Sequence, residues 1–452
     1  MAASLLRAFP RRFALLSPLL LSCSTMPSDT LPDSVAVRVA DPIAWPAGKL
    51  VLVSSAFRAR TDLPDIRLDT LVLTAARDND STVSADLPDT SGDFQLRLQY
   101  RGAARIGTVT LVGFTGRTET VPLTGWPIPT SPGSPVMIAA SESNLVRLDL
   151  SAGSAVDLPV AHSAACAISP GPSFRDSIVV AQSLVAISTC GKPRAWQFAP
   201  TVLAIDSVPY TNAADRLWAH LAPDTWLETE HHLLTIFHSG QVTLNEQLEE
   251  GERAILSPDR SRAVVLTTGN GLLHVPVLLT EPGTLAYRLP LWSAEAAAFS
   301  LDGDTLYAAG ASVFAAGALA RVVAVDAATG VVLVQNDSLE QELWDMVLDP
   351  DAPWLYGVRL ANLVAGGAQP VIEVFDRHTL RFLGRVRPPA NAACAFWPCG
   401  QVGLAIHRAT RTLYAFDVEG WGASFSGTPT AIFRFELVPV SQLPEILSPT
   451  TP

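Results

Sequence analysis

The clearest pattern of apolar and polar positions lies between residues 299 and 330. A short apolar segment precedes a polar turn that contains Asp302 and Gly303. A segment in which apolar and polar residues alternate follows the turn. A further apolar run over residues 322–325 leads into a second turn, which ends at Gly330. Asp and Gly favour tight turns, whereas Val, Leu and Tyr suit a half-buried strand. The stretch therefore predicts a small antiparallel sheet.

Weaker copies of this pattern recur along the chain after residue 135. The equivalent apolar positions, which precede the first turn of each copy, are Ile168, Leu221, Leu256, Phe299, Leu348 and Ile406. Their spacings of 53, 35, 43, 49 and 58 residues scatter around the roughly 40 to 50 residues of a four-stranded repeat unit. One such sheet cannot bury both of its faces alone, so stacking in a ring is expected.

The motif of residues 299–330 reads x-S-x-D-G-x-x-L-Y and then V-x-V-D-x-x-T-G. This order resembles one blade of the YVTN or WD40-like β-propellers of bacterial exported proteins. The resemblance implies an all-β fold with a propeller of about seven blades over residues 136–440. Residues 136–139 and 431–437 are strand-like, and we expect them to pair in one shared blade that closes the ring. A large two-sheet β-sandwich is the alternative architecture.

Short strands separated by turn residues also fill residues 34–126. Residues 94–100 alternate apolar and polar side chains, as expected for a strand with one face in a core and one in water. The number and length of these strands predict a small immunoglobulin-like β-sandwich. Residues 127–135 are rich in proline and predict a stiff linker without regular pairing. Residues 441–452 are expected to be a C-terminal tail.

The N-terminus has the pattern of a targeting segment. Arginines at positions 7, 11 and 12 precede an apolar run over residues 13–21. The run is too short for a membrane span, which needs about 20 residues. An uncleaved anchor, a cleaved signal without lipid and a twin-arginine signal are the alternatives to a lipoprotein signal.

The sequence Leu20-Leu21-Ser22-Cys23 resembles the bacterial lipobox. The resemblance implies that residues 1–22 are a lipoprotein signal peptide, that Cys23 is lipidated, and that the lipid bilayer is a partner through these acyl chains. Residues 23–33 then form a flexible tether. By the same resemblance Ser24 favours the outer membrane or cell surface, so a bacterial cell-envelope location is expected.

Charge excludes one class of partner. The whole chain has a formal net charge of −12, and loss of residues 1–22 removes three arginines and no acids, which gives −15. A protein this acidic is poorly suited to nucleic acid or to anionic lipid surfaces. Membrane attachment is therefore expected through the lipid alone.

Four cysteines remain besides Cys23, an even number in a chain expected to be exported: Cys166, Cys190, Cys394 and Cys399. They allow three pairings. We expect the local pairing, 166 with 190 and 394 with 399, because each pair brackets a plausible hairpin. Metal binding is the weaker alternative, since no second pair of ligands lies beside the last two cysteines.

Candidate chemistry is sparse. His231, His232 and His238 are weak metal candidates, because adjacent residues of a strand point to opposite faces. Four aspartates at turns could bind calcium, but hydrogen bonds to the turn backbone already explain them: Asp302, Asp304, Asp349 and Asp351. The chain lacks the motifs of nucleophilic hydrolases, zinc proteases and phosphate or dinucleotide loops. No catalytic residue, metal or cofactor is therefore predicted.

Two functional hypotheses follow. In the first, the protein is a monomeric lipoprotein that acts as a scaffold and binds a protein or a glycan through its propeller. Seven tryptophans recur across the repeats, where they line a binding face or pack between blades: Trp196, Trp218, Trp226, Trp292, Trp344, Trp354 and Trp397. In the alternative, the protein is a lactonase-like hydrolase that uses the central funnel, although a propeller fold does not select an activity.

Overall fold

The computed structural model describes residues 37–40, 44–58, 62–100, 103–119, 128–129, 136–140, 144–152, 154–161, 179–181, 185–188, 194–197, 203–207, 217–222, 225–230, 233–238, 241–247, 251–258, 262–267, 277–280, 284–289, 291, 293–311, 320–362, 368–387, 401–418, 431–436 and 448–449. Strands dominate these residues, and the only helix among them is the 3-10 turn η1 (Ser55–Phe57). The predicted all-β class is confirmed. The strands form small antiparallel sheets.

Two sheets form the N-terminal part of the protein. The first has the order β1 (Arg38–Val39), β2 (Lys49–Val53), β6 (Thr82–Asp86) and β5 (Ala75–Asn79). The second has the order β37 (Ser448–Pro449), β8 (Ala103–Leu111), β7 (Gly92–Tyr100), β3 (Asp65–Leu68) and β4 (Leu71–Leu73). Both sheets contribute to one hydrophobic core, which includes Leu50, Leu52, Ile66, Leu96 and Leu98. Their alternating strands bury one face against each other.

Within the described residues, seven further four-stranded sheets follow, named sheet 1 to sheet 7 here. Sheet 1 consists of β10 (Ile128–Pro129), β11 (Val136–Ala140), β12 (Asn144–Asp149) and β13 (Ser154–Ala161). Sheet 2 consists of β14 (Val179–Ala181), β15 (Val185–Ser188), β16 (Arg194–Gln197) and β17 (Leu203–Ser207). Sheet 3 consists of β18 (Leu217–Ala222), β19 (Thr225–Glu230), β20 (Leu233–His238) and β21 (Gln241–Gln247). Sheet 4 consists of β22 (Gly251–Leu256), β23 (Arg262–Thr267), β24 (Val277–Thr280) and β25 (Thr284–Arg288). Sheet 5 consists of β26 (Ser293–Phe299), β27 (Thr305–Ala311), β28 (Ala320–Asp326) and β29 (Val332–Leu339). Sheet 6 consists of β30 (Asp345–Leu348), β31 (Trp354–Asn362), β32 (Ala368–Asp376) and β33 (Phe382–Val386), and sheet 7 of β34 (Gln401–His407), β35 (Thr412–Val418), β36 (Ala431–Glu436) and β9 (Phe114–Glu119).

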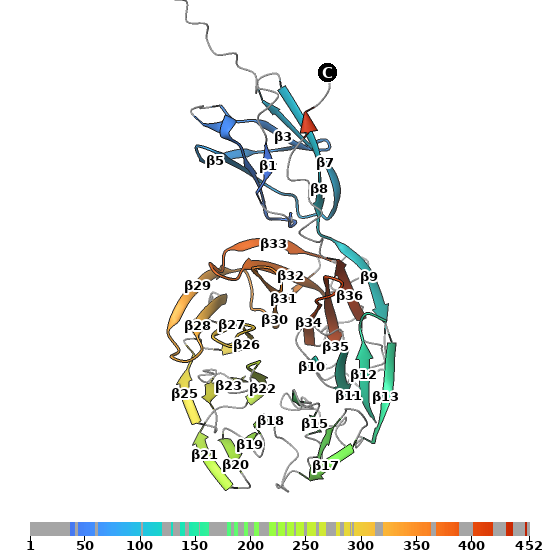
Figure 1. Ribbon diagram of the computed structural model, residues 1–452, viewed down its shortest axis with the longest axis vertical. Helices are drawn as coiled ribbons and strands as arrows, with labels where there is room; N and C mark the ends of the chain where they lie inside the picture. The colour runs from blue at the N-terminus through green and yellow to red at the C-terminus, as the bar shows by residue number, and fades with distance from the viewer. Residues whose placement is uncertain are drawn as a thin grey trace, which may run out of the picture.

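The seven sheets follow one another around a ring in Figure 1, with the first strand of each toward the inside and the fourth toward the outside. The first strands of successive sheets contact each other from β10 through β14, β18, β22, β26 and β30 to β34. Sheet 7 differs from the others because its outer strand comes from the N-terminal side of the chain. This strand, β9, pairs with β36 in the register Ala431 to Glu119.

Strand β28, the third strand of sheet 5, is apolar on both faces. Val323 and Val325 pack in a core shared with sheet 4, whereas Val322 and Ala324 pack in a core shared with sheet 6. Successive side chains of a strand point to opposite faces. Sheet 5 therefore buries two faces, and in β28 a continuous run of Val and Ala replaces the alternation seen in residues 94–100.

Three predicted details need correction. The expected pairing of residues 136–139 with residues 431–437 is wrong, because β11 pairs with β10 and β12 while β36 pairs with β35 and β9. The proline-rich stretch was expected to lack regular pairing, but Ile128 and Pro129 pair with β11. This position is a sheet edge, where a missing N–H group is tolerated. Within the expected tail, Ser448 and Pro449 pair with β8.

Tyr287 of β25 connects sheet 4 to sheet 5. Its hydroxyl donates a hydrogen bond to the Asp326 carbonyl at 3.2 Å. A Cβ atom placed on Gly330 would lie 2.6 Å from the Tyr287 ring, so the turn after β28 approaches the ring closely. Burial raises the pKa of the Tyr287 hydroxyl to about 12, and the nearby Asp326 carboxylate acts in the same direction.

An absorbance titration should show this tyrosine ionising near pH 12. The folded-state pKa lies above the unfolded value of about 10. The hydroxyl therefore contributes stability that is complete below about pH 10 and is lost as the pH rises through the folded-state value. In Tyr287→Phe we expect this high-pH step to vanish and the loss of stability in alkali to become shallower. Superimposable titrations of the two proteins would contradict the assignment.

Candidate functional site

Most of the predicted site residues lie outside the described residues. These are Cys23, Cys166, Cys190, Cys394, Cys399, His231 and His232. His238 is the last residue of β20 and pairs with Thr225 and Gln241. In the part of the chain that the structure describes, no group of three or more His, Cys, Asp or Glu side chains is arranged to hold a metal ion.

The turn aspartates act on the backbone. The Asp302 carboxylate accepts hydrogen bonds from the Asp304 N–H group and the Ser300 hydroxyl. Asp326 accepts from the N–H groups of residues 328 and 329 and from the Thr329 hydroxyl. Asp149 and Asp376 accept the same three kinds of bond at equivalent turns. The pKa of Asp326 is lowered, chiefly by the Thr329 hydroxyl.

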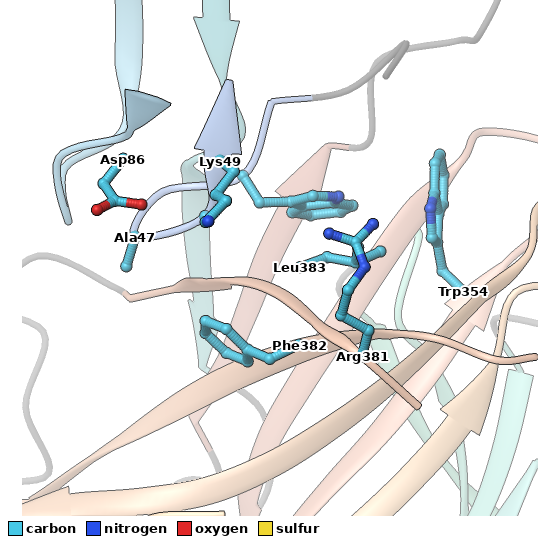
Figure 2. Close-up of a pocket in the computed structure, with 9 residues that line it drawn as sticks. Ala47, Lys49, Asp86, Trp354, Arg381, Phe382 and Leu383 are labelled. Atoms are coloured by element: carbon cyan, nitrogen blue, oxygen red, sulfur yellow. The ribbon is translucent and has the colours of Figure 1, made fainter. Parts of the chain in front are cut away.

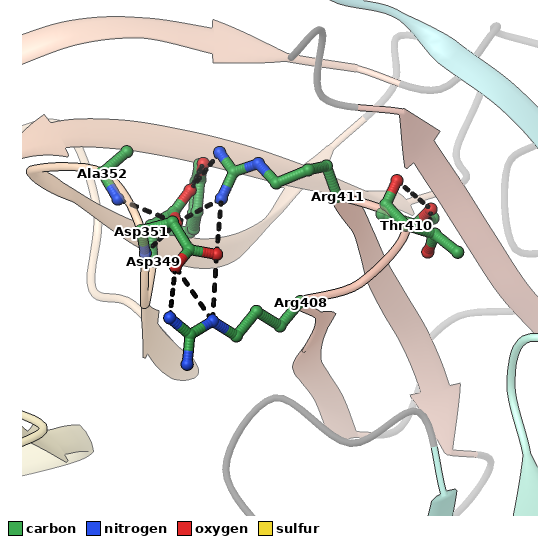
Figure 3. A network of polar contacts seen from close by, with 8 residues as sticks. Asp349, Asp351, Ala352, Arg408, Thr410 and Arg411 are labelled. Atoms are coloured by element: carbon green, nitrogen blue, oxygen red, sulfur yellow. Dashed lines mark hydrogen bonds and ion pairs between the residues drawn. The ribbon is translucent and has the colours of Figure 1, made fainter. Parts of the chain in front are cut away.

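Asp349 differs from the other turn aspartates because it is fully buried and bonded across two sheets (Figure 3). Arg411, in the turn between β34 and β35, donates two hydrogen bonds to it, one of them from Nη2 to Oδ2 at 2.7 Å. The Tyr356 hydroxyl donates to Oδ2 at 2.8 Å, and the N–H groups of residues 351 and 352 donate to Oδ1. The carboxylate therefore links sheet 6 to sheet 7.

The charges around Asp349 fix the protonation of its partners. Burial raises the pKa of Tyr356 well above its ordinary value, and the Asp349 carboxylate adds to this effect. Burial alone would lower the pKa of Arg411, but the hydrogen bonds to Asp349 raise it overall. At the edge of this group, Asp351 forms an exposed ion pair with Arg408 at 2.6 Å and lies 3.9 Å from Arg411. Every polar atom of the Asp349 carboxylate is engaged, so the network favours a structural role.

A second ionic group lies within sheet 6. Arg359 is buried and donates to Glu373 at 2.8 Å and to Glu340 at 2.9 Å. Arg385 also bonds to Glu340, and this bond is the main cause of the lowered pKa of Glu340. Burial raises the pKa of the neighbouring Glu342. Within the described residues no hydrogen bond or ion pair reaches Glu342, so no acid-base pair forms around it.

The N-terminal part meets sheet 6 through the turn before β2. Trp45 packs edge-on against Trp354 and Tyr356, with ring centroids 5.7 and 6.0 Å apart. The Arg385 N–H group donates to the Pro46 carbonyl at 2.7 Å. A Cβ atom placed on Gly48 would lie 1.9 Å from the Leu383 carbonyl oxygen, so the two backbones touch.

Further contacts extend this junction. Trp45 and Val112 belong to the same hydrophobic core as Trp354, Tyr356 and Val358. The side chains of Arg387 and Asp89 form an ion pair at 3.0 Å. Because apolar, backbone and charged contacts all cross the junction, the N-terminal sheets and sheet 6 are packed together as parts of one body.

A cavity of about 240 Å³ opens at this junction. Its apolar lining comes from Trp45, Ala47, Trp354, Phe382 and Leu383, and the Gly48 backbone completes it. Figure 2 shows the side chains of Lys49 and Asp86 at one end, Trp354 at the other and Arg381 between them. The cavity therefore combines aromatic walls with charged groups at its rim, which is typical of sites for small ligands.

The charged groups of the cavity come from two separate parts of the chain. Lys49 and Asp86 are opposite each other in the β2 and β6 pair, and both are exposed. Arg381 precedes β33 and is also exposed. Within the described residues, none of the three side chains takes part in an ion pair.

Sequence reasoning identified only one residue of this cavity, Trp354, as a candidate for binding. Trp45, Lys49 and Asp86 belong to the N-terminal sheets, whose role was expected to be separate from that of the repeats. The sequence Trp45-Pro46-Ala47-Gly48 contained a usable signal, because it places a large aromatic residue directly before a turn that contains Pro and Gly. The sequence does not indicate that Trp45 contacts Trp354.

Comparison with known proteins places the chain in no family. No family model matches the sequence, and no curated protein sequence matches it at a significant level. Among the described residues, no helix has the length and apolar character that a membrane crossing requires.

Proposed function

We propose that sheets 1 to 7 are the blades of a seven-bladed β-propeller and that the N-terminal sheets form an immunoglobulin-like sandwich. Support comes from the strand order of each sheet, from the contacts between successive first strands and from β9, which supplies the last strand of sheet 7. A strand from one end of the repeat region that completes a sheet at the other end is an effective way to close a ring. Closure buries the faces that the first and last blades would otherwise expose.

We propose further that the protein is a membrane-anchored, exported bacterial lipoprotein. It is attached to the outer membrane or cell surface through acyl chains on Cys23 and acts as a monomeric scaffold that binds a protein or a glycan. One observation carries the scaffold role: the packed junction of Trp45, Trp354 and Tyr356. A junction of this kind holds the two parts in a fixed relation, so loops on both can face one partner together.

The test compares the wild type with Cys23→Ser in intact bacterial cells, each with a C-terminal affinity tag. We expect the wild type to incorporate a labelled fatty acid, to sediment with membranes and to capture a defined protein or glycan after cross-linking. Cys23→Ser should lose the label and the membrane association, since several acyl chains at about 0.8 kcal/mol per buried CH₂ group account for stable attachment.

Two results would count against this proposal. Membrane association of Cys23→Ser equal to that of the wild type would contradict lipid anchoring at this residue. Cross-linking that yields no partner beyond those of an unrelated lipoprotein with the same tag would contradict the scaffold role. A purified wild-type protein that hydrolyses lactones or small esters would favour the enzyme in place of the scaffold.

A further inference from the structure

Two tryptophans, each with an indole N–H donor, line the junction cavity. Trp45 is 4% exposed and Trp354 is 6% exposed, and both residues line the cavity. Within the described residues, no hydrogen bond joins either indole nitrogen to a protein acceptor. In the described residues neither indole nitrogen is among the fully buried polar atoms that lack a partner, so each donor remains accessible. A ligand in the cavity can supply an acceptor for them.

The charges of the lining point to an anion. Lys49 and Arg381 contribute two positive charges and Asp86 contributes one negative charge, so the lining carries a net charge of +1. Arg381 extends between Trp354 and the end formed by Lys49 and Asp86 (Figure 2). A guanidinium group beside indole donors matches the planar geometry of a carboxylate, which can accept two parallel hydrogen bonds.

We propose that the junction cavity binds one acidic sugar residue, with its carboxylate toward Arg381 and the two indole N–H groups and its hydroxyls toward Asp86. The apolar walls suit the C–H face of a sugar ring. This binding site does not depend on the proposed scaffold role, because it is formed by the described junction and not by the propeller loops or the lipid anchor.

Charge and size favour an acidic sugar over other small anions. An amino acid is a zwitterion of net charge zero, so it does not complement the net charge of +1 of the lining, whereas a monoanion does. The hydroxyls of a sugar can donate to Asp86. The volume of about 240 Å³ lies below the range of about 300–1,000 Å³ that holds drug-sized ligands. A single sugar ring therefore fits better than an oligosaccharide.

Calorimetric titration of the full chain with glucuronate tests the site, and glucose serves as the neutral probe of the same shape. We expect saturable binding of glucuronate and at least tenfold weaker binding of glucose, because glucose lacks the carboxylate that pairs with Arg381. A third titration uses a disaccharide that ends in glucuronate. Binding of glucuronate alone indicates a free acidic sugar as ligand, whereas binding of both indicates the end of a glycan. Both results support the proposal.

Variants connect the binding to the cavity. Arg381→Gln removes an exposed cation and Trp354→Phe removes one indole donor while keeping a ring, and each should weaken glucuronate binding by about tenfold or more. Arg377→Gln is the matched control on the same turn, because Arg377 does not line the cavity. Its binding should equal that of the wild type.

The proposal is overturned by any of three results. These are no heat of binding with glucuronate, equal affinity for glucose, or unchanged affinity in Arg381→Gln. The last variant changes an exposed side chain and tests the site even if Trp354→Phe does not fold. No binding by the wild type would mean that the cavity holds water only, a result that leaves the scaffold role intact.

Discussion

Replacing Asp349 with alanine is expected to lower the free energy of unfolding by about 3–5 kcal/mol, since removal of one partner leaves a largely buried charge uncompensated. Asp349 is fully buried, and the Arg411 side chain that it binds is 14% exposed. The variant would leave the Arg411 guanidinium without its main partner and the Tyr356 hydroxyl without its acceptor. Thermal and urea unfolding monitored by circular dichroism measure the loss.

Asp351→Ala is the matched control, two residues away in the same turn. Its carboxylate pairs with Arg408 at 2.6 Å, and the two side chains are 37% and 62% exposed. Its contact with Arg411 is much longer, at 3.9 Å. Exposed pairs contribute about 0–1 kcal/mol, so this variant should remain close to the wild type. Equal destabilisation by the two substitutions would show that the turn as a whole, and not the buried carboxylate, holds sheets 6 and 7 together.

Gly48→Ala should separate the N-terminal sheets from sheet 6. The added methyl group would lie 1.9 Å from the Leu383 carbonyl oxygen and 2.9 Å from the Trp45 carbonyl oxygen, both of which are backbone atoms that cannot rotate away. We expect a loss of about 3 kcal/mol, at the upper end of the cost of overpacking a well-packed site. Small-angle scattering should show a more extended molecule, and proteases should cut at the junction.

Ala47→Gly provides the opposite change at the neighbouring residue. Ala47 has a φ of 55°, a left-handed conformation that costs a non-glycine residue roughly 1 kcal/mol. Glycine relieves this strain, so the variant should be as stable as the wild type and as compact in scattering. If Gly48→Ala is as compact and protease-resistant as Ala47→Gly, the close backbone approach at Leu383 does not control docking.

The repeat motif was readable from the sequence because its turns are local. The D-x-x-T pattern that ends β28 and β32 forms hydrogen bonds within four residues. The Thr329 N–H group donates to Asp326, and the Thr379 N–H group donates to Asp376. The interpretation of Asp302 and Asp349 as turn formers rested on the same local chemistry, and the structure contains the expected backbone bonds. The partnership of Asp349 with Arg411 joins residues 62 positions apart, and no local pattern indicates it.

The boundary between the N-terminal sheets and the repeat sheets also could not be predicted from the sequence. Residues 114–119 carry the same strand character as β8 before them, so the sequence places them with the N-terminal strands. The structure instead pairs them with β36, more than 300 residues later. The choice depends on which sheet edge lies free beside the strand, and a strand pattern contains no information on that.

The sequence by itself determined the all-β class, the positions of the repeat turns and the tight Asp-based geometry of those turns, because these depend on residues close together along the chain. Only the tertiary structure decided that β9 completes sheet 7, that Trp45 packs against Trp354, and that Lys49, Asp86 and Arg381 surround one cavity. These contacts join distant segments through shape and burial. Many apolar partners satisfy the same hydrophobic pattern equally well, and packing selects one of them.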